Sequence, residues 1–344
     1  MGYKIKEAIE NAAKEIKGAK KIALQLPDGL KTKSGKIEIE IKKYSSAEIF
    51  VLSGSNFGGC DLNDSEAKKL GADLLLHFGH ADFGVKSSVK TLYLEIQSDL
   101  DIEKVVQKAA KEIKEKKIGL ITTIQHIESL QKAKEILEKN ASEAKLPRIS
   151  RSAQDGKQVF TAMPKGKARK EAQILGCDCS AGSTLKEKVD CYLYIGTGNF
   201  HPLSLAIETG KKVYVADPEL NQVRELTDFK NKILMQISEK IEKAKSVQKF
   251  GILLTTKPGQ RREKLAEKLK DLIESTGKNA EILVFDTINP DDLKNFKLDA
   301  YVNTACPRIP IDDIEAFDKP ILSPAELEIV LGIRRWGYYK LDHF

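Results

Sequence analysis

The same order of segments occurs three times along this chain. In each third, an apolar segment runs into a Gly-, Pro- or Thr-rich turn, a second apolar segment follows an aspartate, and a short apolar segment comes last. Such repetition indicates a fold assembled from similar supersecondary units. The opening segments begin at Lys20, Lys116 and Lys249, the second segments follow Asp73, Asp190 and Asp299, and the last segments begin at Lys90, Lys211 and Lys319.

Stretches with helical spacing of apolar residues separate these segments. The two longest predict helices near residues 101–116 and 228–246 that connect the repeats. The apolar segments are continuous rather than alternating, which is typical of strands buried on both faces of a parallel sheet. We therefore predict an α/β fold of three similar domains, each with a parallel sheet flanked by helices, comprising residues 1–102, 103–228 and 229–344.

Composition narrows the classes of function. The 57 basic and 50 acidic residues give a formal charge of +7, but they are mixed rather than gathered in blocks, so we expect no direct binding of nucleic acid. No apolar run reaches the roughly 18 residues of a membrane span, and the charged N-terminal segment lacks a signal-peptide core. We expect a cytoplasmic protein without a membrane partner. Five cysteines in a reducing compartment favour metal or redox chemistry over disulfides.

Three of the cysteines are distributed one to each third of the chain. Cys60, Cys177 and Cys306 each lie in a loop at the end of a predicted strand, and we expect these strand ends to be equivalent. In parallel α/β sheets, ligands bind at the carboxyl ends of strands, so three thiolates could converge on an iron-sulfur cluster. Cys191 lies within a predicted strand and is expected in the core. Cys179, two residues from Cys177, is either a spare thiol or the true ligand.

Other interpretations of these residues stay open. Each cysteine taken alone could be a small buried residue without chemical function. Three thiolates with one open position would also suit a catalytic zinc ion. His80 and His201 occupy the loops that correspond to the one carrying Cys306, where they could bind a carboxylate or phosphate, or only satisfy a loop carbonyl. The compact three-cysteine motif of ordinary radical S-adenosylmethionine enzymes is absent, as are the common phosphate-loop and hydrolase motifs.

Several phrases in the sequence resemble the archaeal diphthamide-biosynthesis protein 2 family. They follow the family's order over about residues 20–325, and TACPR followed by an acidic pair is the most specific. One departure is GGCD at Gly58, where relatives more often have Tyr-Gly-Ala-Cys. The phrases are LPDGL at Leu26, SGSNFGGCDLN at Ser53, LLHFGHADF at Leu75, QILGCD at Gln173, GNFHPL at Gly198 and TACPRIPIDD at Thr304.

The resemblance implies a fold and a site. Members of the family are homodimers of three similar α/β domains, related by a pseudo-threefold arrangement around a central 4Fe-4S cluster. Each domain supplies one cysteine, and the match assigns Cys60, Cys177 and Cys306 to the cluster, with Cys177 rather than Cys179 as the second ligand.

The resemblance also implies an activity. The family transfers a 3-amino-3-carboxypropyl radical from S-adenosylmethionine to the imidazole C2 of a histidine in translation elongation factor 2, the first step of diphthamide biosynthesis. This transferase reaction needs an electron donor. From their loop positions, Gly54, His80 and Asn199 are candidates for binding S-adenosylmethionine.

Two alternative functions follow from the same three-cysteine pattern. Quinolinate synthase also holds a cluster with one cysteine from each of three domains, but uses the open iron as a Lewis acid. A non-catalytic iron-sulfur subunit that assists a partner enzyme is the second alternative. The C-terminal tail GIRRWGYYKLDHF combines arginines with aromatic residues, which favours either an interface or a tail folded back on its own domain.

Overall fold

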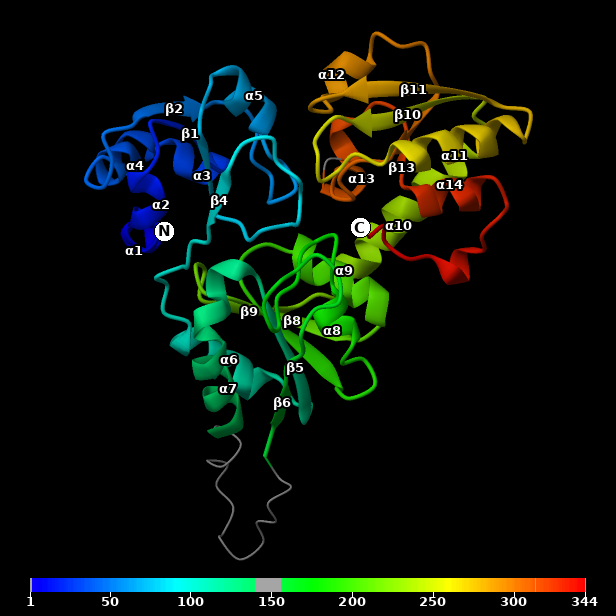
Figure 1. Ribbon diagram of the computed structural model, residues 1–344. Helices are drawn as coiled ribbons and strands as arrows, with labels where there is room; N and C mark the ends of the chain where they lie inside the picture. Colours follow the sequence, from blue (N-terminus) through cyan, green and yellow to red (C-terminus); the bar gives the residue numbers. More distant parts are fainter. Residues whose placement is uncertain (1, 140–155, 313, 344) are drawn as a thin grey trace, which may run out of the picture.

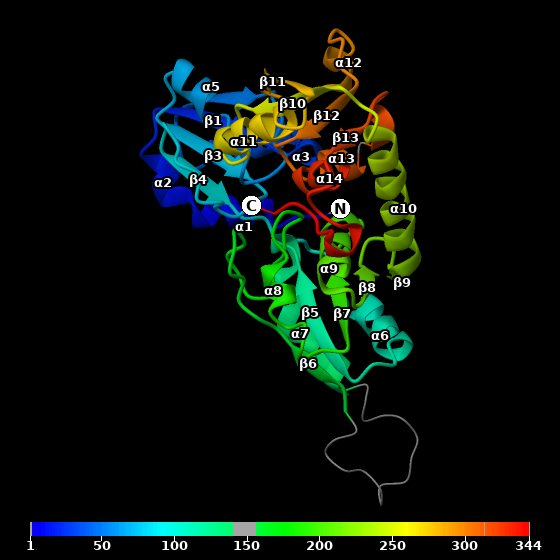
Figure 2. The ribbon, with the colours of Figure 1, turned by 90° about the vertical axis from the view of Figure 1, so that its right-hand side faces the viewer.

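The computed structural model describes residues 2–139, 156–312 and 314–343. Figure 1 shows three α/β lobes around a common centre: lobe one in blue to cyan, lobe two in green, and lobe three in yellow to red. In Figure 2, lobe two lies below the other two lobes. Each of the three sheets falls within one of the predicted domains. The boundaries themselves, near residues 102 and 228, and the pseudo-threefold relation stay predictions.

The three sheets share one strand order, in which the first strand of the repeat lies between the second and third, and the fourth lies beyond the third. The threefold repetition predicted from the sequence is therefore confirmed. Lobe one contains β1 (Lys21–Gln25), β2 (Glu48–Leu52), β3 (Leu74–Phe78) and β4 (Thr91–Leu94); lobe two contains β5 (Lys117–Thr122), β6 (Gln158–Phe160), β7 (Cys191–Ile195), β8 (Lys212–Asp217) and β9 (Gln222–Glu225); lobe three contains β10 (Lys249–Thr255), β11 (Asn279–Phe285), β12 (Ala300–Asn303) and β13 (Ile321–Leu322).

Strand β9 is a departure from the predicted parallel sheets. It pairs antiparallel with β8, whereas the other strand pairs of the lobe-two sheet are parallel. The connection between the two strands is short and contains Asn221 with a φ of 50°, a left-handed conformation that asparagine tolerates in tight turns. A connection this short can only form a hairpin, because a parallel pair needs a long crossover.

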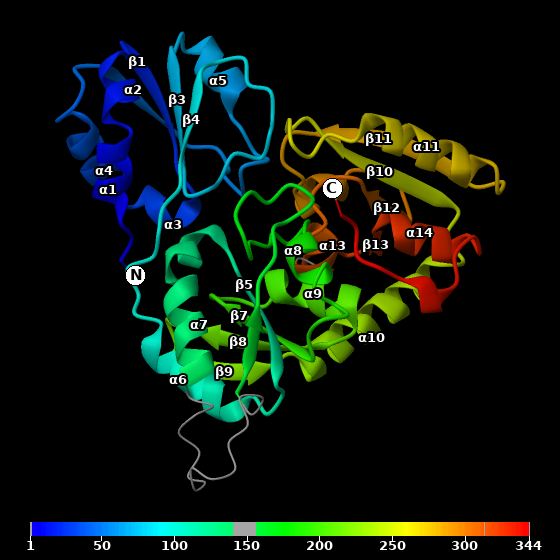
Figure 3. The same ribbon diagram turned by 60° about the horizontal axis from the view of Figure 1, so that its bottom comes forward.

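Two helices connect successive lobes, as the sequence predicted. Helix α6 (Glu103–Glu112) begins lobe two, and α10 (Thr227–Ala244) runs from lobe two to lobe three (Figure 3). The remaining helices are α1 (Ile5–Asn11), α2 (Ala13–Lys17), α3 (Asp28–Lys31), α4 (Ser34–Ile41), α5 (Asp64–Lys69), η1 (Ile124–Ser129), α7 (Leu130–Lys139), α8 (Ser180–Ser183), α9 (Phe200–Thr209), α11 (Glu263–Glu274), α12 (Pro290–Leu293), α13 (Ile309–Asp312), η3 (Ile314–Ala316), α14 (Pro324–Val330) and η4 (Trp336–Tyr338).

Each sheet is covered on both faces, which explains the continuous apolar strands. In lobe one, residues of α1, α2 and α4 form one core and residues around α5 form a second. In lobe two, α6 and α7 pack on one face and α8 and α9 on the other. In lobe three, α11 and α14 pack on one face of the sheet, and the segment around α12 packs on the other. In the described part of the chain, no helix combines the length and apolar character that a membrane span requires.

The repeated aspartates fix the register of each sheet. Each lies just before the third strand of its lobe, and its carboxylate accepts backbone N–H groups at the start of the first strand. The two strands therefore begin level, and their carboxyl ends finish at the same edge. The bonds run from Lys20 and Lys21 to Asp73 (2.9 and 3.0 Å), from Lys117 to Asp190 (2.9 Å), and from Lys249 to Asp299 (3.1 Å).

The C-terminal tail folds back on its own chain, which was one of the two alternatives. The Tyr339 hydroxyl donates to Glu326 at 3.2 Å, and Asp342 pairs with Arg262 of lobe three. His343 then reaches lobe two, where its Nδ1 lies 3.3 Å from the carbonyl oxygen of Cys177. The terminus consequently lies between the lobes, as Figure 1 shows.

A buried ion pair joins α10 to α14, and substitution of its members tests how these two helices are held together. Lys240 Nζ lies 2.8 Å from Glu326 Oε2, with the side chains only 5% and 1% exposed. We expect Lys240→Met to lower the free energy of unfolding by about 3–5 kcal/mol, because it leaves the Glu326 carboxylate buried without its partner. Urea denaturation measures the effect. The double variant Lys240→Met/Glu326→Gln should recover part of the loss; equal losses in both variants would contradict this account.

Candidate metal centre

Cys60, Cys177 and Cys306 line one cavity of about 310 Å³ at the centre of the molecule. One comes from each lobe, and all three thiols are partly exposed to the cavity rather than fully buried. The structure therefore brings together the three cysteines singled out from the sequence. Neither Cys179 nor Cys191 lines this cavity.

The loops that carry the cysteines are not all equivalent, so the expected equivalence of their strand ends is wrong. Cys60 and Cys177 precede the third strand of their lobes, whereas Cys306 follows the third strand, β12. The expected strand before Cys177 is also absent: Gln173 and Leu175 form only isolated bridges. The thiols still converge, because both kinds of loop lie at the carboxyl ends of parallel strands.

A loop of lobe three holds the Cys60 loop of lobe one. Gly259 N donates to the Cys60 carbonyl at 2.9 Å, and Gln260 Nε2 donates to Cys60 Sγ at 3.3 Å. The approach needs a glycine, since a Cβ at position 259 would lie 2.5 Å from the Cα of Cys60. Neither Gly259 nor Gln260 was predicted from the sequence, although their turn, TTKPGQ, follows the opening strand of its repeat.

A buried ion pair lies beside this contact. Lys257 Nζ is 2.6 Å from Asp61 Oδ1 and 2.7 Å from Ser55 Oγ. Asp61 is fully buried and its second oxygen accepts from the Ser55 hydroxyl at 2.9 Å and from the Phe57 N–H at 3.2 Å. Two charges excluded from water need this degree of pairing. The pair therefore fixes the residue next to Cys60 to lobe three.

Cys177 and Cys306 are positioned by their neighbours in sequence. Asp178 accepts from the backbone N–H of Ala168 at 2.8 Å and of Ser180 at 2.9 Å, which shapes the loop around Cys177. In the other loop, Asn303 Nδ2 donates to the Cys306 carbonyl at 2.9 Å. These hydrogen bonds hold the backbone next to each of the two thiols.

The thiols influence one another electrostatically. Burial raises the pKa of Cys177 well above its usual value, and the nearby Cys60 and Cys306 raise it further. Burial also raises the pKa of Cys60. Three adjacent thiolates are unfavourable without a compensating positive charge, and metal coordination supplies one. This donor set fits an iron-sulfur cluster.

Two further cysteines belong to the core. Cys191 lies in β7 among the apolar side chains between the sheet and α6, which confirms its prediction as a core residue. Cys179 is 3% exposed and packs against the opposite face of the same sheet. Burial raises the pKa of each to about 12. Cys177, rather than Cys179, is therefore the thiol available at the cavity.

The possible metal donors of the described residues do not form a compact site for a single ion. Within residues 2–139, 156–312 and 314–343, no three His, Cys, Asp or Glu side chains are grouped closely enough to hold a single metal ion. The three cysteines instead surround a cavity.

The residues suggested for S-adenosylmethionine lie in different surroundings. His80 lines the cysteine cavity. Gly54 is exposed outside it, and its carbonyl accepts from Lys31 at 2.9 Å. Asn199 also lies outside the lining, where its Oδ1 accepts from Arg224 at 3.0 and 2.8 Å. Roles for all three in binding S-adenosylmethionine stay predictions.

A chain of hydrogen bonds leads from the core of lobe one to His80. Gln25 Oε1 lies 3.0 Å from His77 Nδ1, and His77 Nε2 lies 3.0 Å from His80 Nδ1. Burial lowers the pKa of His80 to about 4 and that of His77 well below its usual value. His201, on the lobe-two side of the same cavity, has its pKa lowered to about 4 by burial and by the Arg308 cation. All three imidazoles are neutral at neutral pH.

The fold and this cavity define a three-lobed α/β protein that gathers one cysteine from each lobe. A family model described as "Putative diphthamide synthesis protein" matches residues 26–340. The chain is 34% identical to the 2-(3-amino-3-carboxypropyl)histidine synthase of Pyrococcus horikoshii, covering 96% of this chain and 91% of the relative. The synthase of Methanocaldococcus jannaschii is 30% identical, with coverages of 94% and 87%. The chain belongs to the diphthamide synthesis protein family.

A solved structure agrees with the fold. The crystal structure of Dph2 from Pyrococcus horikoshii with a 4Fe-4S cluster matches with a TM-score of 0.86 at 30% identity, covering 100% of this chain and 94% of that one. The family and the α/β fold predicted from the sequence are both confirmed.

The close contact at Gly259 supports a second test. We expect Gly259→Ala to lower the free energy of unfolding by about 1–3 kcal/mol, because the added methyl overlaps the Cys60 backbone and forces two lobes apart. Thermal denaturation measures the change. Gly35→Ala is the matched control: its Cβ meets open space in α4, and the variant should gain up to about 1 kcal/mol. Equal stability of the two variants would contradict the close contact.

Proposed function

We propose that this chain is a 2-(3-amino-3-carboxypropyl)histidine synthase that catalyses the first step of diphthamide biosynthesis on translation elongation factor 2. The observation that carries the proposal is the cavity lined by Cys60, Cys177 and Cys306, one from each lobe, in a member of the diphthamide synthesis family. A relative 34% identical over most of the chain bears this name, and a matching structure holds a 4Fe-4S cluster.

The three cysteines would hold the cluster. When bound through three thiolates, a 4Fe-4S cluster has one iron open to S-adenosylmethionine and can reach potentials low enough to donate an electron to a sulfonium. The 3-amino-3-carboxypropyl radical released from S-adenosylmethionine would add to the imidazole C2 of the target histidine, and the adduct would then give up one electron and the C2 proton. The net products would be the substituted histidine, methylthioadenosine and a proton. The protein contributes the binding and the orientation of both reactants.

The described residues supply groups suited to that task. Arg308 lines the cavity beside Cys306 and offers a cation to the carboxylate of S-adenosylmethionine. The Gln260 amide donates to Cys60 Sγ at 3.3 Å, a contact that orients this ligand and tunes the metal. The neutral imidazoles of His80 and His201 add hydrogen-bonding groups without a competing positive charge.

The partners follow from the reaction. Elongation factor 2 is the protein substrate, and an electron donor reduces the cluster. The resemblance to the family, rather than the reaction, is the ground for proposing a homodimer in the cytoplasm. The formal charge of +7 would speed the encounter with an acidic surface of the elongation factor.

Product analysis separates this function from the alternatives. With the chain reconstituted anaerobically with iron and sulfide, dithionite and S-adenosylmethionine should yield methylthioadenosine, detected by liquid chromatography and mass spectrometry. Adding elongation factor 2 should transfer the 3-amino-3-carboxypropyl group to one histidine. Formation of quinolinate from its precursors instead would replace our proposal with the quinolinate synthase function, and a cluster-loaded chain that yields no product would favour the auxiliary subunit.

Substitution of single cysteines tests the ligand set. We expect Cys60→Ala, Cys177→Ala and Cys306→Ala each to lose the visible absorption of the cluster and most bound iron, because each removes one of three ligands. Cys179→Ala and Cys191→Ala are the matched controls and should retain both signals, since those thiols lie in the core. Iron and sulfide analysis per chain provides the measurement. Loss of iron in Cys179→Ala with retention in Cys177→Ala would reverse the assignment of the second ligand.

A further inference from the structure

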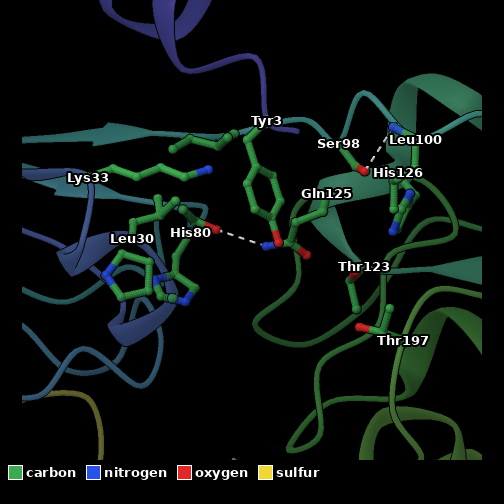
Figure 4. A pocket seen from close by; sticks show the side chains of 14 residues that line it. Tyr3, Leu30, Lys33, His80, Ser98, Leu100, Thr123, Gln125, His126 and Thr197 are labelled. Atoms are coloured by element: carbon green, nitrogen blue, oxygen red, sulfur yellow. Dashed lines mark hydrogen bonds between the residues drawn. The ribbon is translucent and has the colours of Figure 1, made fainter. Parts of the chain in front are cut away.

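A second cavity, of about 470 Å³, lies between lobe one and lobe two. Figure 4 shows its lining, in which Tyr3, Ser98, Gln125 and Thr197 surround the open space. Apart from Lys33, the lining carries no Lys, Arg, Asp or Glu side chain. The chamber is almost uncharged, and its lining mixes polar side chains with apolar ones such as Leu30, Ile96 and Leu100.

This chamber adjoins the cysteine cavity. His80, Thr123 and Gln125 line both spaces. The Gln125 amide donates to the Gly79 carbonyl at 2.9 Å, which holds the lobe-two side of the boundary against the lobe-one side (Figure 4). A side chain that enters the chamber from solvent would therefore reach the cysteine cavity past His80.

The hydrogen-bond chain fixes which nitrogen of His80 carries the proton. The Gln25 amide nitrogen donates to the carbonyls of Ser55 and Asp61, so its oxygen must be the atom that faces His77. His77 Nδ1 therefore carries a hydrogen, and its Nε2 accepts from His80 Nδ1–H. In the neutral ring of His80, the remaining Nε2 is then an unprotonated acceptor.

That acceptor has no protein partner among the described residues, and it is not enclosed. The His80 side chain makes one hydrogen bond, through Nδ1. Its Nε2 makes none with the described residues and is not fully buried, so this atom faces open space. A second unused group lies in the same chamber: His126 is 6% exposed, and its Nδ1 is buried without a hydrogen-bond partner. Buried polar atoms without a partner are uncommon in proteins, so a water or a ligand group is expected beside His126 Nδ1.

A third cavity, which also touches the cysteines, carries more charged groups than the chamber does. A cavity of about 370 Å³ shares Cys60, Cys306 and Arg308 with the central one, and its lining also includes Asp28, Lys257 and Asp286. S-adenosylmethionine carries a carboxylate, an ammonium and a sulfonium, which suit this charged side. A histidine side chain is a neutral ring with one donor and one acceptor, which suits the uncharged chamber.

We propose that the chamber between lobes one and two admits the target histidine of the protein substrate, whose imidazole N–H donates to His80 Nε2. His80 is then a binding residue that orients the acceptor ring at the edge of the cysteine cavity. The inference rests on the proposed function and adds to it the route and the orientation of the second substrate.

Plugging the chamber tests the route. Gly29 and Thr197 are exposed residues on opposite walls, and neither lines the cysteine cavity. A Cβ at Gly29 would meet open space, so Gly29→Trp can fold. We expect Gly29→Trp and Thr197→Trp to lower transfer to elongation factor 2 by at least about tenfold, equivalent to about 1.4 kcal/mol, while dithionite still yields methylthioadenosine. Gly35→Trp is the matched control, because its Cβ also meets open space but it lines none of the three cavities.

The hydrogen bond is tested separately. His80→Leu removes the acceptor and should raise the KM for elongation factor 2 by about 2- to 10-fold, the range of one net hydrogen bond. His80→Gln offers a side-chain oxygen and should recover part of that loss. The ratio of transfer to methylthioadenosine formation is the readout in both variants.

The outcomes distinguish this inference from the proposed function. Wild-type chain that forms no methylthioadenosine would contradict the proposed function itself. If wild type is active and both tryptophan variants transfer normally, the chamber is not the route. If the tryptophan variants stop methylthioadenosine formation but bind the elongation factor normally, the chamber belongs to S-adenosylmethionine, and the inference is overturned.

Discussion

The central cavity depends on one contact, the docking of the lobe-three loop onto the Cys60 loop of lobe one. The buried Lys257 and Asp61 pair at 2.6 Å, and Gly259 lies directly against the Cys60 backbone. A site that takes one ligand from each of three lobes needs such a joint, because its geometry is only as rigid as the packing between the lobes.

The choice of a buried ion pair for this joint has a physical consequence. Displacing one partner of a buried ion pair leaves an uncompensated buried charge, so a shift of the lobe-three loop out of register with Asp61 is costly. Apolar packing alone would tolerate small shifts of one loop over the other. The Gln260 amide at 3.3 Å from Cys60 Sγ depends on the same register.

The sequence predicted what local patterns encode. Apolar segments and repeated aspartates predicted three similar α/β units, because each unit forms from neighbouring residues. The distribution of Cys60, Cys177 and Cys306, one to each third, predicted their meeting. The partners of those thiols escaped prediction, since Gln260 lies 200 residues from Cys60 and no periodicity marks such a contact. Strand β9 was missed because a four-residue hairpin strand has too little pattern to recognise.

His77 illustrates the same limit and leads back to function. In the sequence it is one polar residue within an apolar strand, with nothing to distinguish it from a histidine that satisfies a neighbouring carbonyl. In the fold, its position in β3 places it between Gln25 of β1 and His80 beyond the strand end. The parallel register of β1 and β3 thus determines the protonated nitrogen of His80. A backbone pairing that stabilises lobe one also determines which group faces the cavity where the lobes meet.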